Sequence, residues 1–270
     1  KIMPDNNSFN RLIKARNGFL LYNKNDMYIG KSIEKYGEFS HLEAKLFEQI
    51  CKDGDIVIEV GANIGAHTIY LSKLVGNGFV IAYEPQRLIF QNLCANLAIN
   101  SISNVYAFQE AVSDENGTII IPECNFKENN NFGGINIENT KNGTTVNKQK
   151  IDNFLNKIDR LKLLKIDVEG MEISVIKGAS ELIKKFRPMI YVENDRQEHS
   201  KELIELLWSL DYKMYWHLPK LYNENNFFND KENIFGNIVS VNMFCIHKDS
   251  NIKILDMTEV LDSSFHPMKR

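Results

Sequence analysis

Residues 55–65 have the sequence Asp55-Ile-Val-Ile-Glu59-Val-Gly61-Ala-Asn63-Ile-Gly65. The apolar run Ile56–Val60 is typical of a short buried strand, and the glycines that follow it indicate a tight turn that opens a helix. Gly61 allows a ligand to approach the backbone closely, and Gly65 eases the turn into the packing of the helix. We therefore predict a strand, a turn and a helix that bind a small ligand at the carboxyl end of the strand.

This turn differs from the G-x-G-x-x-G motif of dinucleotide-binding enzymes. The second and third glycine positions of that motif are occupied here by Asn63 and Ala66. Glu59, at the end of the strand, would repel a pyrophosphate, but it suits the ammonium and sulfonium groups of S-adenosylmethionine, which carries no phosphate. We predict that the turn binds S-adenosylmethionine, and an NAD-type oxidoreductase is the alternative. The predicted donor-binding residues of this segment are Glu59, Gly61, Ala62, Asn63 and Gly65.

Apolar strands alternate with amphipathic helices along most of the chain. This alternation is typical of a parallel sheet that is covered by helices on both faces. The last strand follows a loop and not a crossover helix, so it can return antiparallel. The sequence predicts an α/β, Rossmann-like fold with a doubly wound seven-stranded sheet, mostly parallel with an antiparallel last strand. The predicted strands are 56–60, 79–83, 105–108, 161–166, 189–192, 212–216 and 238–246, and the predicted helices between them include 64–75, 88–97, 173–186 and 203–210.

The domain organisation follows from where this alternation begins and where it is interrupted. Residues 1–37 precede it and are predicted to form an amino-terminal β extension, with strands at Phe19–Tyr22 and Met27–Ile29. We predict one domain over residues 38–270, with loop insertions near 122–150 and 218–237, where asparagine-rich segments replace the periodic pattern.

The composition is that of an ordinary globular protein of 270 residues. The net charge is −3, with 32 basic and 35 acidic residues, which counts against nucleic acid or a membrane surface as a partner. No apolar run is long enough to span a bilayer, and residues 1–10 lack the apolar core of a signal peptide, so we expect a cytoplasmic protein. The four cysteines form no C-x-x-C pair and are expected to be free thiols.

Two further strand ends carry residues that suit an adenosine. Glu84 and Pro85 follow the second strand, where a carboxylate can accept hydrogen bonds from both ribose hydroxyls. Glu110 and Ala111 follow the third strand, where Glu110 could accept from the adenine amino group. The alternative for both acids is ordinary solvated polarity at the end of a strand.

Four segments of the chain resemble the FkbM family of methyltransferases. They are Glu59–Gly65 in the form E-x-G-A-N-x-G, Ala82–Pro85, Ala111–Asp114, and Leu164–Gly170 with the sequence L-K-I-D-V-E-G, which is the most specific of them. The resemblance covers roughly residues 38–195. It implies a doubly wound sheet, S-adenosylmethionine as methyl donor, and O-methylation of a hydroxyl on a sugar, glycan or natural product. Residues after 196 fall outside the shared part, and we expect them to choose the acceptor.

Acidic residues after the fourth and fifth strands are the candidates for catalysis. An aliphatic hydroxyl is a poor nucleophile, so a general base or a metal ion is expected. Asp167 is the first candidate for the base, and Glu193 lies at the neighbouring strand end. Glu169 is a further candidate, although it could instead stabilise the start of the following helix. His217 could act as a base near neutral pH, but a histidine at a strand end is often an ordinary polar residue.

The same strand ends offer ligands for a metal ion or for the acceptor. Asp167, Glu193 and Asn194 would supply three oxygen atoms, which is similar to the metal site of catechol-type O-methyltransferases and would suit Mg²⁺. Hydrogen bonding to acceptor hydroxyls is the alternative, and no metal site is assigned. A non-catalytic adenosine-binding module is also compatible with the fold. The residues predicted to bind the acceptor are Asn194, Asp195, Trp216 and His217.

Overall fold

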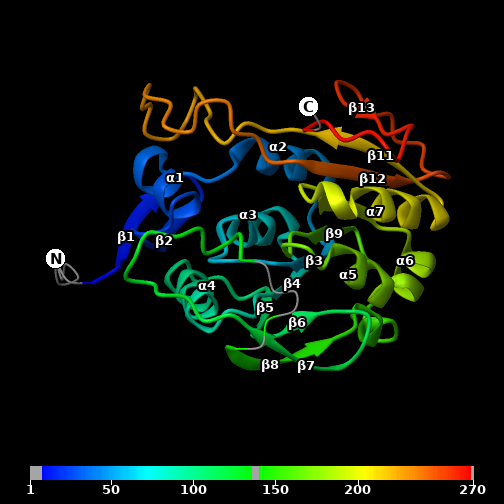
Figure 1. Ribbon diagram of the computed structural model, residues 1–270, viewed down its shortest axis with the longest axis horizontal. Coiled ribbons are helices and arrows are strands. Elements are labelled where there is room, and N and C mark those ends of the chain that lie inside the picture. Colours follow the sequence, from blue (N-terminus) through cyan, green and yellow to red (C-terminus); the bar gives the residue numbers. More distant parts are fainter. Residues whose placement is uncertain (1–7, 136–139, 141, 269–270) are drawn as a thin grey trace.

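The predicted strand at 56–60 is present as β3 (Ile56–Val60), and all of its residues are buried. The structure is a computed structural model that describes residues 8–135, 140 and 142–268 (Figure 1). β3 lies between β4 (Phe79–Tyr83) and β9 (Leu163–Ile166), and the three strands are parallel. Because apolar side chains point to both faces of these strands, both faces must be covered by helices.

The main sheet has the strand order β13-β11-β12-β10-β9-β3-β4-β5, which places β3 and β9 near its centre. Its other strands are β5 (Val105–Phe108), β10 (Met189–Glu193), β11 (Tyr212–His217), β12 (Asn242–His247) and β13 (Thr258–Glu259). β12 is antiparallel to both of its neighbours, β10 and β11, whereas the strands from β10 to β5 are parallel. The predicted fold class is confirmed, and the two-residue β13 adds an edge strand to the seven that were predicted.

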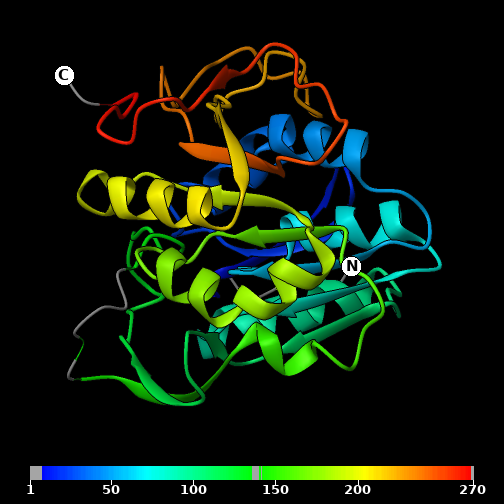
Figure 2. The same ribbon diagram turned by 90° about the vertical axis from the view of Figure 1, so that its right-hand side faces the viewer.

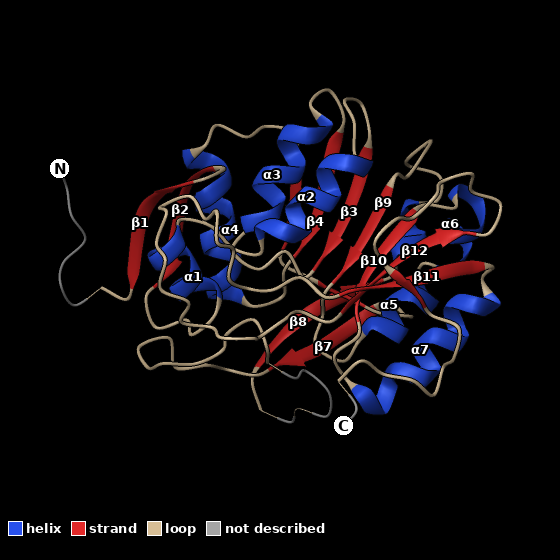
Figure 3. Ribbon diagram, turned by 90° about the horizontal axis from the view of Figure 1, so that it is seen from above, coloured by secondary structure: helices blue, strands red, loops and turns tan. Residues whose placement is uncertain are grey.

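Helices cover both faces of this sheet (Figure 3). One layer packs through Phe47, Leu71 and Leu93 and consists of α2 (His41–Ile50), α3 (Ala66–Val75) and α4 (Arg87–Ile99). The other layer packs through Val175, Leu182 and Leu203 and consists of α5 (Glu172–Gly178), α6 (Ser180–Phe186) and α7 (Gln197–Ser209). In Figure 2 this second layer, coloured green to yellow, lies in front of the sheet. The sheet is therefore doubly wound.

Several predicted elements differ in extent from those in the structure, for example α7, which starts at Gln197 and not at residue 203. The helix predicted at 173–186 is divided into α5 and α6. Gly178 lies at the division, and a Cβ atom there would come within 2.0 Å of the Ser113 carbonyl oxygen, so the close approach to that backbone requires glycine. The last strand starts at Asn242 and not at Ile238, because residues 238–241 line a cavity instead of joining the sheet.

The amino-terminal extension is partly helical. β1 (Asn10–Ala15) and β2 (Gly18–Asn23) form an antiparallel hairpin, so the predicted strand at 19–22 is present. The second predicted strand, Met27–Ile29, is wrong, because Ile29 begins α1 (Ile29–Tyr36). The buried residues Ile29, Ile33 and Tyr36 recur at helical spacing, and this pattern prevails over the strand propensity of the first few residues.

A small second sheet lies around the first predicted insertion, and one of its three strands, residues 144–149, belongs to the insertion. β6 (Ala111–Val112), β8 (Thr144–Gln149) and β7 (Gly117–Ile121) lie side by side in this order, and the short helix η1 (Ile151–Phe154) follows. β7 pairs with β8 across the intervening segment. Residues 136–139 and 141 of the predicted insertion lie outside the described residues.

Two expectations from composition can be compared with the structure. Cys51, Cys94, Cys124 and Cys245 are all free thiols, as predicted. Within the described ranges, the helices are too short or too polar to cross a membrane.

Candidate active site

The carboxyl ends of β3, β4, β9 and β10 face a cavity of about 450 Å³. One side of it consists of the turn after β3, together with Glu84, Asp167 and Glu193 from the ends of the other three strands. Segments 131–134 and 238–242 and part of the amino-terminal extension form other walls. Ligands of open α/β sheets bind at this edge, and the volume lies in the range of small-molecule sites.

The turn after β3 packs tightly against the end of β9. Gly61 has a φ of 84°, and a Cβ atom on it would come within 1.8 Å of the Asp167 carbonyl oxygen. The amides of Gly61 and Ala62 both donate to the Tyr83 carbonyl, at 3.0 and 2.8 Å. Asn63 is also left-handed, with a φ of 49°, and its amide points back towards β4. The backbone of the turn is therefore fixed by both neighbouring strands.

Glu84 is tied to this turn. Its carboxylate accepts hydrogen bonds from the amide of Asn63 at 3.0 Å and from the amide of Gln86 at 2.8 Å. The side chain is buried and lines the cavity. Burial raises the pKa of Glu84 to about 7, because the two amide donors only partly offset the loss of water. Glu84 thus stands where a ligand hydroxyl could donate to it.

Lys165, on β9, is a charged residue that lines the cavity. Its side chain is 2% exposed, and Nζ lies 3.6 Å from Glu59 Oε1 and 3.4 Å from Asp167 Oδ2. Glu59 also accepts a hydrogen bond from the Thr68 hydroxyl at 2.6 Å. Burial opposes the charged form of Lys165, but Asp167, Glu59 and Glu43 outweigh this effect and raise its pKa. Burial also raises the pKa of Glu59, and the nearby charge of Lys165 and the hydrogen bond from Thr68 only partly offset this effect.

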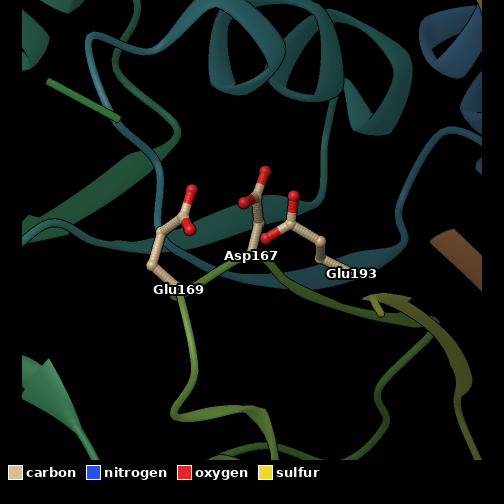
Figure 4. A group of neighbouring side chains, drawn as sticks. All are labelled: Asp167, Glu169 and Glu193. Atoms are coloured by element: carbon tan, nitrogen blue, oxygen red, sulfur yellow. The ribbon is translucent and has the colours of Figure 1, made fainter. Parts of the chain in front are cut away.

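The structure brings Asp167, Glu169 and Glu193 together (Figure 4). One carboxylate oxygen of each lies within 4.8 Å of the others, so the three side chains could hold a cation. Arg196 donates to Glu169 at 2.6 Å, and burial, followed by the charges of Asp167 and Asp195, raises the pKa of Glu169 to about 8.

Glu193 differs from the other two acids in having a buried oxygen without a partner among the described residues. Its Oε2 is buried and accepts no hydrogen bond from the described residues. Burial, followed by the charges of Asp167 and Glu169, raises the pKa of Glu193 well above its ordinary value. Asp167 is the most exposed member of the group, with a side chain 41% exposed and an ion pair to Lys165. Asp167 is therefore the acid that is best placed to meet a second ligand.

Some residues predicted to bind the acceptor or a metal point elsewhere. Asn194 follows Glu193 directly, so its side chain turns to the other face of the strand, where it donates to Ser200 Oγ at 3.0 Å. Trp216 is buried in the core cluster beneath the second helix layer. His217 Nδ1 lies 2.8 Å from the Tyr191 hydroxyl, away from the cavity lining. Of the predicted acceptor-binding residues, Asp195 lines the cavity.

Some predicted donor-binding residues also lie outside the cavity lining. Gly65 packs on α4, where a Cβ atom would come within 2.6 Å of Leu93. Pro85 lines a separate, smaller cavity of about 180 Å³. Ala111 is buried in β6, and Glu110 accepts a hydrogen bond from Gln149 Nε2 at 2.5 Å. Glu110 is not among the residues that line the main cavity.

The apolar wall of the cavity comes partly from residues 28 and 39, which the sequence did not link to the site, and partly from residues after 196, which were expected to choose the acceptor. It consists of Tyr28, Phe39, Leu221, Ile238 and Val239. The charged residues Lys165, Arg196 and Glu43 were likewise missed. A signal for Lys165 was present, because a lysine inside the apolar strand Leu163–Ile166 needs charged partners. No comparable pattern marks the wall, since its members are far apart in the sequence.

Comparison with known proteins identifies the family of the chain. The family model described as the methyltransferase FkbM domain matches residues 59–214. Methyltransferase sdnD of Sordaria araneosa is 26% identical over 188 residues, covering 54% of this chain and 73% of that protein. Hexuronic acid methyltransferase AglP of Haloferax volcanii is 23% identical over 185 residues, covering 68% of this chain and 73% of that protein. A solved methyltransferase FkbM from Methylobacillus flagellatus gives a TM-score of 0.45 at 18% identity, over 75% of this chain and 50% of that one.

Proposed function

The chain belongs to the FkbM family of S-adenosylmethionine-dependent methyltransferases, and on this premise we propose that it methylates a hydroxyl oxygen of a sugar-like or natural-product acceptor. The observation that carries the proposal is the arrangement of Asp167, which lies beside the glycine turn and is open to the same cavity. A donor held by the turn and an acceptor held over the strand ends would meet at this residue.

The residues of the cavity fit the donor. Gly61 leaves the turn open to a close ligand, and Glu84 can accept hydrogen bonds from ribose hydroxyls while the amides of Asn63 and Gln86 hold it in place. The acids around Lys165 favour a ligand that carries a positive charge. When bound, S-adenosylmethionine supplies an electrophilic methyl group on a sulfonium centre. We therefore assign Glu59, Gly61, Ala62, Asn63 and Glu84 to the donor side of the cavity.

Asp167 is the proposed base. Lys165 binds its Oδ2, which fixes the orientation of the carboxylate, and the exposed part of the side chain faces the cavity. Asp167 takes the proton of the acceptor hydroxyl as the oxygen–methyl bond forms, so the hydroxyl does not have to become a free alkoxide. Glu193 and Glu169 lie next to Asp167. We propose that they form hydrogen bonds, as acceptors or as donors, with other hydroxyl groups of the methyl acceptor.

The acceptor class is supported by two features. AglP, by its name, is a hexuronic acid methyltransferase, and it is a distant relative of this chain. The wall of Tyr28, Phe39 and Leu221 opposite the acids gives the cavity an apolar side, and a few polar groups facing an apolar wall are typical of sites that orient a hydroxylated small molecule.

Single-turnover transfer from methyl-labelled S-adenosylmethionine tests the proposal. The acceptor panel contains neutral sugars, hexuronic acids and hydroxylated polyketides or terpenes, and mass spectrometry locates the methyl group, with and without a chelator. We expect transfer to oxygen for one class, and Asp167→Asn should lower the rate at least about a hundredfold while it keeps donor affinity. Binding without transfer to any class, or transfer to nitrogen or carbon, would contradict the proposal.

A further inference from the structure

The amino-terminal extension and the first insertion are joined beside the donor turn. The Met27 amide donates to the Asn130 carbonyl at 3.0 Å, and the Asn130 amide donates to the Asn25 carbonyl at 3.0 Å. The side-chain amides of Asn23 and Asn25 both donate to the Phe126 carbonyl, at 2.9 and 3.0 Å. In Figure 1 this green segment runs alongside the blue elements β2 and α1. Residues 126–130 are thus held by the backbone and side chains of residues 23–27.

Phe132 anchors the next part of the same segment. Its side chain is 1% exposed and packs in a cluster with Ile29, Ile64 and Ile89, and its ring stacks on Phe126 at 4.6 Å. Its carbonyl accepts a hydrogen bond from Gln86 Nε2 at 2.8 Å. Because Gln86 directly precedes α4 and its amide donates to Glu84, this bond connects the segment to the ribose end of the proposed donor site.

The anchored segment forms a wall of the cavity. Asn131, Gly133 and Gly134 line it together with Asn63 and Glu84. A Cβ atom on Gly133 would lie 3.1 Å from Asn63 Nδ2, and one on Gly134 would lie 2.0 Å from Asn131 Nδ2. The wall therefore lies directly against the donor turn, and a larger side chain at either glycine would have to displace Asn63 or Asn131.

We propose that residues 130–134 are a wall of the S-adenosylmethionine site, and that Gln86 and Phe132 are the positioning residues that hold this wall over the donor. The inference rests on the proposed placement of the donor between the β3 turn and Glu84. It gives the amino-terminal extension a role in donor binding, although residues 10–36 lie outside the family match at 59–214.

Exchange of bound, radiolabelled S-adenosylmethionine against unlabelled donor tests this inference, and it needs no acceptor. Gln86→Ala removes the bond to the Phe132 carbonyl, and we expect the donor to dissociate about tenfold faster, the effect of losing one buried hydrogen bond. Gln91→Ala is the matched control, because Gln91 lies on the exposed side of the same helix, α4. The control should keep the wild-type rate.

A second variant separates the wall from direct contact by Gln86. Phe132 does not line the main cavity, so Phe132→Leu removes no direct contact with the donor and acts through the residues that Phe132 packs against. We expect faster donor dissociation in this variant too, and hydrogen exchange should show that the donor protects residues 126–134 and 24–30 in the wild type more than in either variant. Wild-type dissociation rates in both variants would overturn the inference alone. A wild-type protein that binds no S-adenosylmethionine would overturn the proposed function with it.

Discussion

Glu84 is a buried acid in the proposed donor site, so its ionisation should affect the binding of the donor. Its carboxylate is held by two backbone amides and faces the cavity, and burial raises its pKa to about 7. The ionised form can accept two ribose hydrogen bonds, whereas the protonated form has lost part of this acceptor capacity. The affinity for the donor should therefore depend on pH near neutrality.

We expect the affinity for S-adenosylmethionine to fall about tenfold between pH 8 and pH 6. Glu84 is ionised above its raised pKa and takes up a proton as the pH falls through about 7, so the loss occurs on the acidic side. Isothermal titration calorimetry across this range measures it. Glu84→Gln cannot ionise, so it should bind the donor more weakly at pH 8, and its affinity should depend less on pH. If the affinity of Glu84→Gln changed with pH in parallel with that of the wild type, the assignment would be contradicted.

The buried position of Lys165 leads to a prediction about the free energy of unfolding. Lys165→Met leaves Glu59 buried without its cation, and the removal of one partner from a buried ion pair costs about 3–5 kcal/mol of the free energy of unfolding. The double variant Lys165→Met/Glu59→Gln removes both charges and should recover part of this loss. Urea denaturation measures the difference, with Lys162→Met, directly before the start of β9, as the control. Equal stability of the single and double variants would contradict the expectation that the unpaired charge of Glu59 causes the loss.

At the scale of single residues, the sequence located the glycine turn and the strand-end acids that line the cavity, but not all of their partners. Glu59 and Asp167 were predicted, but Lys165, which binds both, was not. Asn194 was predicted beside Glu193, and alternation along the strand turns it away. A motif fixes which residues follow a strand, whereas the direction of each side chain depends on the register of that strand.

At the scale of elements, the parallel strands were predicted closely because each is a short apolar run with turn residues on both sides. The elements that were missed depend on partners far away in the sequence. β8 forms because it can pair with the edge of β7. α1 forms in place of a predicted strand because its apolar face packs against a cluster that includes Ile64 and Phe132. Local patterns do not contain these contacts.

The packing of β3 on β9 gives the element-scale prediction. Gly61→Ala places a Cβ atom against the Asp167 carbonyl, so the donor turn and the end of β9 must move apart. Gly54→Ala is a matched control, since Gly54 has a φ of 85° and a methyl group added there would meet no neighbouring atom within 4 Å. Both variants carry a left-handed strain of about 1–2 kcal/mol. Only Gly61→Ala should also lose donor binding, measured by calorimetry, and equal behaviour of the two would contradict the packing argument.

At the scale of the whole molecule, two segments outside the matched region of 59–214 come together over the cavity. The amino-terminal extension contributes Tyr28, and the segment after β11 contributes Leu221 and Ile238. The two are joined by Tyr36, whose hydroxyl donates to the Glu232 carbonyl at 2.9 Å, and by stacking between Tyr28 and the ring of Phe235. The apolar wall of the cavity, which we propose to be the acceptor wall, is thus built by the parts of the chain that precede and follow the family motifs.

Glu38 is the polar centre of this junction. Its carboxylate accepts hydrogen bonds from Arg16 Nε at 2.5 Å, from Asn223 Nδ2 at 2.8 Å and from the Phe227 amide at 2.9 Å. Glu38→Ala leaves three donors without their acceptor, so the segment 219–241 should be held less tightly to the amino-terminal extension.

We expect Glu38→Ala to speed hydrogen exchange in residues 219–238 about tenfold or more, while the affinity for S-adenosylmethionine stays within about twofold, because the donor side of the cavity is held by other contacts. Glu232→Gln is the control: its side chain is 73% exposed and pairs with Lys35 at the surface, so little should change. If Glu38→Ala weakened donor binding as much as it loosened this segment, the two sides of the cavity would be coupled, and the acceptor wall could not be regarded as an independent part of the site.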